Sequence, residues 1–160
     1  MSMVNSQDTP ALRISYSLLR VIYKFFDIDQ KTRYYGTDHP LSYVEIHLIS
    51  AIHRNEGVHV TGLAEILGVT KGAVSQVLMK LETKGYVLKE RDPLNQSRFL
   101  LKLTPKGETA HRHHIEFHNK FDELVCQILK GQTDGNVQFL EDFIEAFDQK
   151  LDCWAEIVDP

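Results

Sequence analysis

Four of the eight histidines in this 160-residue sequence lie in the stretch HRHHIEFH, residues 111 to 118. On a helix, His114 and His118 share one face, about one turn apart, because they are four residues apart. This is the spacing at which two helical histidines share a zinc ion. His111 lies on that face one turn earlier, whereas His113 points elsewhere. The stretch therefore predicts half of a metal site.

Two earlier segments offer the remaining ligands of such a site. His47 lies in the apolar segment YVEIHLI, and FFDIDQ carries Asp27 and Asp29 near the end of the first predicted helix. Zinc prefers four ligands in a tetrahedron, although histidine and carboxylate groups suit other divalent metals as well. The sequence therefore predicts zinc, or another divalent metal, as a ligand of this protein.

Other interpretations of the same histidines remain open. They could form a solvated helix face, or His47 and His114 could bind a small organic effector in an apolar cleft. A zinc-dependent hydrolase is a remote alternative, because three histidines with an open position can activate water. The sequence contains no GxSxG, HExxH or phosphate-binding glycine motif, so we expect no enzyme. The expected lining of the effector cleft is Tyr16, Tyr23, Phe26 and Tyr43.

Apolar residues at spacings of three and four predict the helices that position these groups. Ser42 and Glu45 predict a capping box at the start of the second helix. In the third, we expect Leu63, Ile66 and Leu67 to be buried. The segments YVLKERD and RFLLKLT predict two strands joined by a polar turn. The helices are expected at about residues 12–29, 42–55, 60–68, 70–85, 105–130 and 137–154.

The segment VTGLAEILGVTKGAVSQVLMKLETKGYV is typical of a helix-turn-helix, with a tight turn at Gly68 and Val69. Its second helix turns an apolar stripe inward and polar side chains outward. Gln76 can bond an adenine edge, lysines can reach guanine or phosphate, and free N–H groups near Thr70 favour a phosphate. The candidate DNA-binding residues, including two wing arginines, are Thr70, Lys71, Gly72, Ser75, Gln76, Lys80, Arg91 and Arg98.

Charge is distributed unevenly along the chain. The net charge is −4, yet residues 71–106 carry a net +5 and residues 122–160 a net −8. Local charge is the electrostatic footprint that matters for DNA. We expect no membrane span, no secretory signal and a cytoplasmic location. Cys126 and Cys153 are expected to be free thiols, buried as small apolar groups.

These motifs resemble the MarR family of bacterial winged-helix regulators. The matching residues are LAEILGVTKGAVSQVLMKLETKGYVLKERDP and LTPKG, within a resemblance that runs from Leu12 to Trp154. It implies a mainly α fold with a two-stranded β wing, in one domain over residues 1–160. Residues 42–104 would form the DNA-binding lobe, and residues 11–35 and 105–156 the dimerisation helices. It also implies a homodimer that binds a pseudo-palindromic operator in double-stranded DNA, usually as a repressor.

Two details of this resemblance concern the candidate sites. At the wing tip, the family's Asp-x-Arg falls on Asn95 and Ser97, and Arg98 is shifted by one position. The chain also resembles the zinc-responsive uptake repressors of the family. Their second metal site uses a cysteine and two glutamates, where this chain has Tyr35, Ile46 and His113. For the first site, the resemblance implies the ligands Asp29, His47, His114 and His118.

Overall fold

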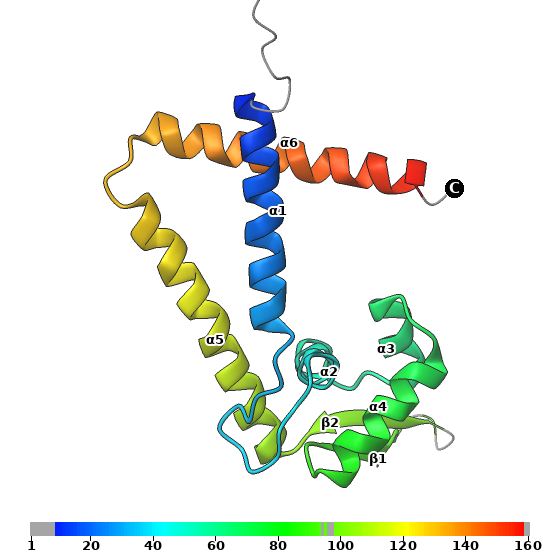
Figure 1. Ribbon diagram of the computed structural model, residues 1–160. Helices are drawn as coiled ribbons and strands as arrows, with labels where there is room; N and C mark the ends of the chain where they lie inside the picture. Colours follow the sequence, from blue (N-terminus) through cyan, green and yellow to red (C-terminus); the bar gives the residue numbers. More distant parts are fainter. Residues whose placement is uncertain (1–8, 94, 96–97, 159–160) are drawn as a thin grey trace, which may run out of the picture. The chain divides into compact units, whose positions relative to one another are not determined.

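The computed structural model describes residues 9–93, 95 and 98–158. The elements are mainly helices with one two-stranded antiparallel sheet, which confirms the predicted fold class. The chain forms two compact units that meet between Glu116 and Phe117, inside one continuous helix. In chain order the elements are α1 (Pro10–Asp29), α2 (Tyr43–Arg54), α3 (Val60–Leu67), α4 (Lys71–Thr83), β1 (Val87–Arg91), β2 (Phe99–Leu103), α5 (Pro105–Leu129) and α6 (Asp134–Val158) (Figure 1).

Side-chain caps begin the helices that carry the candidate sites. At α2, the Ser42 hydroxyl accepts from the Glu45 backbone N–H, and the Glu45 carboxylate accepts from the Ser42 backbone N–H. This is the predicted capping box. At α4, the Thr70 hydroxyl accepts from the Ala73 backbone N–H. Gly68 ends α3 with φ of 64°, a left-handed conformation that favours glycine.

The core of the first unit lies among α2, α3, α4 and the sheet. Leu63 is fully buried, as predicted, but Ile66 is 54% exposed and Leu67 38% exposed. The prediction for those two was wrong, because Leu63 and Ala64 already make the buried side of this eight-residue helix. The last turn of α3 therefore lies beyond the core. The largest fully buried apolar side chains are Leu41, Ile46, Ile49, Ile52, Leu63, Leu78, Leu81, Tyr86 and Leu101.

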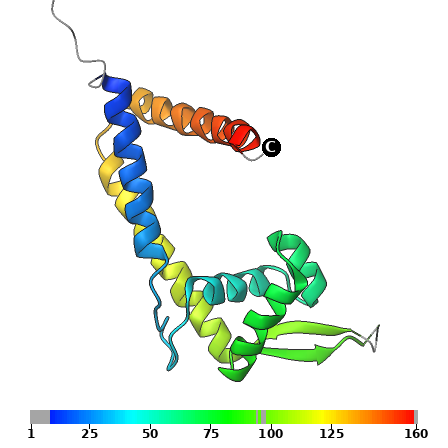
Figure 2. The same cartoon turned by 45° about the vertical axis from the view of Figure 1, so that its right-hand side comes forward.

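The two strands form the predicted wing. Val87 pairs with Leu103 at its base, and Arg91 pairs with Phe99 toward its tip. Val87 is buried and Arg91 is exposed, so the hairpin leaves the core as it extends past α4 (Figure 2). Leu101 donates its backbone N–H to the Val58 carbonyl at 2.9 Å, which joins β2 to the segment before α3. Ser97 lies outside the described residues.

The second unit consists of the later part of α5 and the helix α6. Many of its large apolar side chains are exposed, including Phe139 and Trp154 on α6. Cys126 and Cys153 are free, but both are exposed, so the prediction that they are buried was wrong. No helix in the described part of the chain is long and apolar enough to cross a membrane.

Candidate functional site

The outer face of α4 carries the predicted DNA-binding side chains. Its inner side is fixed by Val74, Leu78 and Leu81, which are buried in the core. The stripe of buried residues leaves the opposite face in solvent, as the periodicity predicted. All eight candidate residues are exposed: Thr70, Lys71, Gly72, Ser75, Gln76, Lys80, Arg91 and Arg98. This exposure is the geometry that contact with a groove requires.

A recess of about 610 Å³ lies between the starts of α3 and α4 and the wing. Lys71 and Arg98 line it, as predicted candidates, and Lys89 of β1 joins them. Lys89 also pairs with Glu82 at 2.7 Å. Sequence reasoning missed Lys89, although it lies two residues before Arg91 and therefore on the same face of the strand. Three cations and the carboxylate of Glu65 line this recess, and their net positive charge suits a phosphate of the DNA backbone.

The two wing arginines have different surroundings. The Arg91 guanidinium lies 5.8 Å from the centre of the Phe99 ring, a cation–π distance. Arg98 instead lines the recess beside α4. On α4 itself, Gln76 and Lys80 border a second recess of about 430 Å³ on the same exposed face. The candidate residues therefore form two groups, one along α4 and one between α4 and the wing.

Three of the four predicted metal ligands come together. One ring nitrogen from each of His47, His114 and His118 lies within 4.8 Å of the other two. His118 follows His114 by one turn of the continuous helix α5, as the spacing predicted. The His47 and His114 rings meet edge to face, with centroids 4.9 Å apart. Three imidazoles at this spacing suit a transition metal such as zinc.

The hydrogen bonds of two rings indicate which nitrogens would bind the metal. His47 Nδ1 lies 3.0 Å from the Tyr43 carbonyl oxygen, which can only accept, so this nitrogen carries the hydrogen. His114 is 1% exposed, and its Nδ1 lies 2.9 Å from the Ser50 hydroxyl. Nε2 of His47 is then its unprotonated nitrogen, whereas the Ser50 hydroxyl can donate to or accept from Nδ1 of His114. Metal-binding histidines usually hold their second nitrogen in this way.

Asp29, the fourth predicted ligand, is buried but is not one of the three grouped residues. It is 6% exposed, and Oδ1 has no hydrogen-bond partner among the described residues. Burial raises the pKa of Tyr35 despite the lowering effect of Arg33, and the Asp29 carboxylate adds to the rise. The Tyr35 ring in turn lies edge-on to His114 at 5.6 Å. An unpartnered buried carboxylate is costly, which fits a role as a ligand.

Asp27, the other carboxylate considered at this helix end, is exposed and pairs with Lys31 at 3.6 Å. The positions of the second metal site offer no ligand set. Ile46 is buried and apolar, and His113 packs so closely on Gly36 that a Cβ there would lie 2.3 Å from the ring. His113 Nδ1 also faces Glu116 at 3.0 Å. The described residues therefore fit one metal ion rather than two.

The predicted effector cleft is only partly assembled. Tyr16 and Tyr23 are each 70% exposed on α1. Phe26 lies near Tyr43, with ring centroids 6.3 Å apart, and Tyr43 lies 4.1 Å from His47. Two of the four aromatic residues thus reach the histidine cluster, and the other two stand in solvent.

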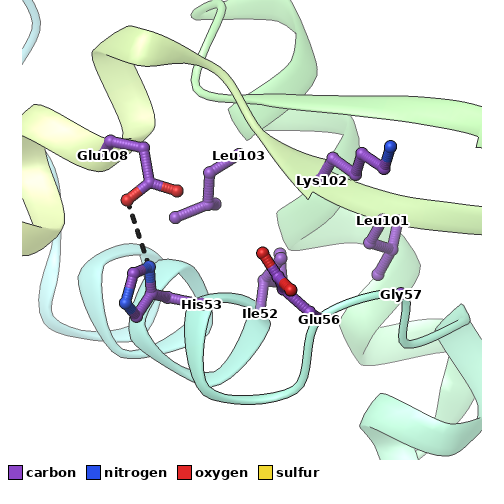
Figure 3. Close-up of a pocket in the computed structure, with 8 residues that line it drawn as sticks. All are labelled: Ile52, His53, Glu56, Gly57, Leu101, Lys102, Leu103 and Glu108. Carbon is purple, nitrogen blue, oxygen red and sulfur yellow. Dashed lines mark ion pairs between the residues drawn. The ribbon is translucent and has the colours of Figure 1, made fainter.

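Further polar contacts join α2 to the start of α5. The Ser50 hydroxyl lies 3.2 Å from Nδ1 of His111, in addition to its contact with His114. The His111 ring stacks on His53 at 4.0 Å, and burial lowers the pKa of His111. His53 Nδ1 lies 3.1 Å from Oε2 of Glu108, and both residues line a pocket of about 430 Å³ (Figure 3). Sequence reasoning missed Ser50, His53 and Glu108.

Comparison with known proteins agrees with this geometry. Residues 39–96 match the model of the MarR family. The HTH-type transcriptional regulator YhjH of Bacillus subtilis (strain 168) is 29% identical over 107 residues. That match covers 67% of this chain and 61% of YhjH, so the chain spans about three-fifths of that relative's length.

Two solved structures share the fold. Streptococcus pneumoniae FabT, crystallised in complex with DNA, has a TM-score of 0.69 and 26% identity and covers 89% of this chain and 97% of its own. Lactococcus lactis ZitR, a zinc-responsive MarR family member, has a TM-score of 0.70 and covers 87% of this chain and 97% of its own. At 17% identity, the likeness to ZitR shows the fold alone.

Proposed function

We propose that this protein, which belongs to the MarR family of winged helix-turn-helix proteins, is a transcription regulator that binds double-stranded DNA. The observation that carries the proposal is the exposed polar face of α4 beside the basic recess at the wing. The chain's relative YhjH is an HTH-type transcriptional regulator, and FabT, which shares the fold, was crystallised in complex with DNA. The remote hydrolase alternative is therefore dropped.

In this proposal, the first turns of α4 enter the major groove. Gln76 reads a base edge there, because its amide offers one donor and one acceptor side by side, which matches adenine. Lys71, Lys89 and Arg98 hold a backbone phosphate in the recess, which fixes the position of α4 without reading sequence. Arg91 and Arg98 extend the contact along the wing.

We propose further that the protein acts as a homodimer and represses transcription. Exposed apolar side chains on α6, among them Phe139, Ile144 and Trp154, need a partner to cover them. A second copy satisfies this need with a C2 interface, which is the commonest arrangement in oligomers. A symmetric dimer then presents two α4 helices to the two halves of a pseudo-palindromic operator.

The proposed regulator is a divalent metal ion, zinc in the first instance. His47, His114 and His118 would hold it, and Asp29, a buried carboxylate with an unpartnered oxygen, would complete the set. The ion supplies positive charge and a fixed geometry of ligands. The support comes from the chain's own residues, since the Tyr43 carbonyl and the Ser50 hydroxyl already orient two of the rings.

Regulation follows from where the ligands lie. His47 belongs to α2, which packs in the core with α4, whereas His114 belongs to α5. Ligands shared by both helices hold α2 in one position against α5 and reduce the freedom that is lost on binding DNA. We therefore propose that zinc tightens DNA binding, and by linkage DNA tightens zinc binding by the same factor.

An organic effector remains the second candidate, because Phe26, Tyr43 and His47 form a continuous row of rings. Binding to a random-sequence duplex pool tests the DNA proposal. Enrichment of a palindromic sequence, bound with an affinity that falls steeply with salt, is the expected result. If the protein retains no duplex from the pool, the DNA proposal is wrong, and the winged helix would instead serve to bind another protein. Enrichment that is equal with zinc and with a chelator would favour the organic effector.

A further inference from the structure

The polar contacts between α2 and α5 form a ladder with regular spacing. On α2 the participating residues recur every third position, which keeps them on one face. On α5 they recur at the same spacing but in the opposite direction, so each α2 residue meets an α5 residue nearer the helix start. The rungs are His47 with His114, Ser50 with His111 and His114, and His53 with Glu108 and His111.

The middle rung contains one hydroxyl between two ring nitrogens. Ser50 is 1% exposed, and its Oγ lies 2.9 Å from His114 Nδ1 and 3.2 Å from His111 Nδ1. A serine hydroxyl has one hydrogen to donate and two lone pairs that accept. If it donates to one of the two rings, the other ring must donate to it; its two lone pairs also allow it to accept from both rings.

The metal site decides between these arrangements. If His114 binds a metal through Nε2, its remaining hydrogen is on Nδ1, and Ser50 must accept that hydrogen. The serine's own hydrogen is then available to His111. The opposite arrangement would put a hydrogen on Nε2 of His114 and exclude it as a ligand. The orientation of one hydroxyl therefore determines whether the site is ready for metal.

We propose that Ser50 is a positioning residue of the metal site. Its hydroxyl accepts the Nδ1 hydrogen of His114, which directs Nε2 to the cluster, and donates its own hydrogen to Nδ1 of His111. His111 thereby takes the tautomer with hydrogen on Nε2 and stacks on His53, which Glu108 holds. The His53–Glu108 contact in Figure 3 is thus the far end of a chain of contacts that runs from His114 through the Ser50 hydroxyl to His111 and then through the ring stack of His111 on His53.

This inference rests on the proposed metal regulation and adds a definite atomic state to it. It also gives a role to His111, which is not a proposed ligand, because the tautomer of its ring shows whether the Ser50 hydroxyl donates to it. Groups that hold a metal-bound histidine from outside typically change metal affinity about 10–100-fold when they are removed. Ser50 is expected to act within that range.

The state of each ring can be observed directly by NMR of the full-length protein labelled with ¹⁵N in its histidines. Two-bond couplings from the ring carbon protons identify which nitrogen carries the hydrogen. In the zinc-loaded protein we expect hydrogen on Nδ1 of His114 and on Nε2 of His111. Hydrogen on Nδ1 of His111 in that state would overturn the proposal, because Ser50 would then accept from both rings.

Substitutions provide the second arm, read as zinc affinity in competition with a chromophoric chelator. Ser50→Ala should weaken zinc binding about 10–100-fold and should leave the His111 ring without a fixed tautomer. Ser17→Ala, an exposed serine on α1, is the matched control and should bind zinc as the wild type does. Equal affinity in Ser50→Ala and the wild type would contradict the proposal.

A pair of variants with equal side-chain size guards against a simple packing defect. Ser50→Thr keeps the hydroxyl and Ser50→Val replaces it with a methyl group, so any strain is shared. Zinc affinity should be higher in the threonine variant by about tenfold or more, and equal values would refute the role of the hydroxyl. If the wild type itself binds no zinc, the proposed metal regulation fails. If the wild type binds and only the variants show no difference, the role of Ser50 alone fails.

Discussion

The proposed DNA-binding face of α4 and the histidine cluster of α2 and α5 are built in opposite ways. The side chains on α4 are exposed and close together in sequence, and one buried stripe on the same helix orients them. The cluster is assembled from helices more than 60 residues apart, and its rings depend on Ser50 and the Tyr43 carbonyl. A DNA-binding face needs only one helix that turns the correct side to solvent. A metal site needs ligands from segments that are far apart in the sequence.

This difference predicts that substitutions in the two regions have different consequences. Substitutions on the outer face of α4 should weaken DNA binding and leave folding intact, because the side chains that they remove are exposed to solvent. Changes in the cluster should affect metal affinity and stability together, because His114 and Ser50 are almost fully buried. The following substitutions test that separation in order of expected effect.

The largest effect is expected for His114→Ala. It removes a proposed ligand, so zinc affinity should fall by more than about 100-fold, beyond the range for groups outside the ligand set. His113→Ala is the control, since His113 is adjacent in sequence but lies against Gly36 and Glu116. Chelator competition measures both variants. Similar zinc affinity in the two would remove His114 from the site.

Gln76→Ala should have the next largest effect, on DNA alone. Loss of a bidentate base contact costs about 1–3 kcal/mol, and the thermal midpoint should stay at the wild-type value. Fluorescence anisotropy with the selected duplex measures the change. Gln138→Ala, an exposed glutamine on α6, is the matched control. A lowered thermal midpoint in Gln76→Ala would show that the α4 face is not independent of folding.

Glu45→Gln tests the contact between the start of α2 and the end of α4, the two helices that carry His47 and the proposed DNA-binding face. Although burial raises the pKa of Glu45, hydrogen bonds from Lys84 at 2.6 Å and from the Ser42 backbone outweigh it, so its pKa is lowered below 4.5. A lowered pKa stabilises the fold above pH 4.5, and that stabilisation is lost as the pH falls through the folded-state value. Glutamine keeps the cap but not the charge.

For this variant the free energy of unfolding at pH 7 should fall by about 1–2 kcal/mol. The deficit relative to the wild type should shrink as the pH falls below 4.5, which urea titrations at a series of pH values can measure. A deficit that stays constant across that range would mean that the charge of Glu45 contributes nothing.

Lys89→Ala should have the smallest effect. Removing one phosphate contact should weaken binding to all duplexes alike and lower the salt-dependence slope by about 1. Lys150→Ala, an exposed lysine on α6, provides the control. Titrations of the selected duplex at several salt concentrations measure the slope. A change in sequence preference instead of slope would move Lys89 from phosphate contact to base reading.

The same difference decides what could be predicted from the sequence. The helix-turn-helix, its caps and the wing follow from short-range spacing. Of the inward stripe predicted at Val74, Val77, Leu78 and Leu81, three residues are buried and Val77 is half-buried. Spacing failed for Ile66 and Leu67, because periodicity cannot say where a core ends. Spacing also could not identify the Tyr43 carbonyl and the Ser50 hydroxyl, which contact the histidine rings.

The three-residue spacing of His47, Ser50 and His53 is visible in the sequence. Only the structure shows that these side chains contact residues of α5 that recur at the same spacing. Ser50 gave no signal of its own, because a serine in a helix is ordinarily solvated or bonded to its own backbone. Asp29 was predicted from a resemblance, and the structure adds that its carboxylate is buried with an unsatisfied oxygen.

The most direct test of the central claim is the affinity of the wild-type protein for the selected duplex across a series of buffered free zinc concentrations. The account predicts that zinc lowers the Kd by at least about fivefold, within the usual range of allosteric coupling. It also predicts that His114→Ala binds the duplex with one affinity throughout. An unchanged or weaker affinity of the wild type with zinc would contradict the claim that the histidine cluster controls DNA binding.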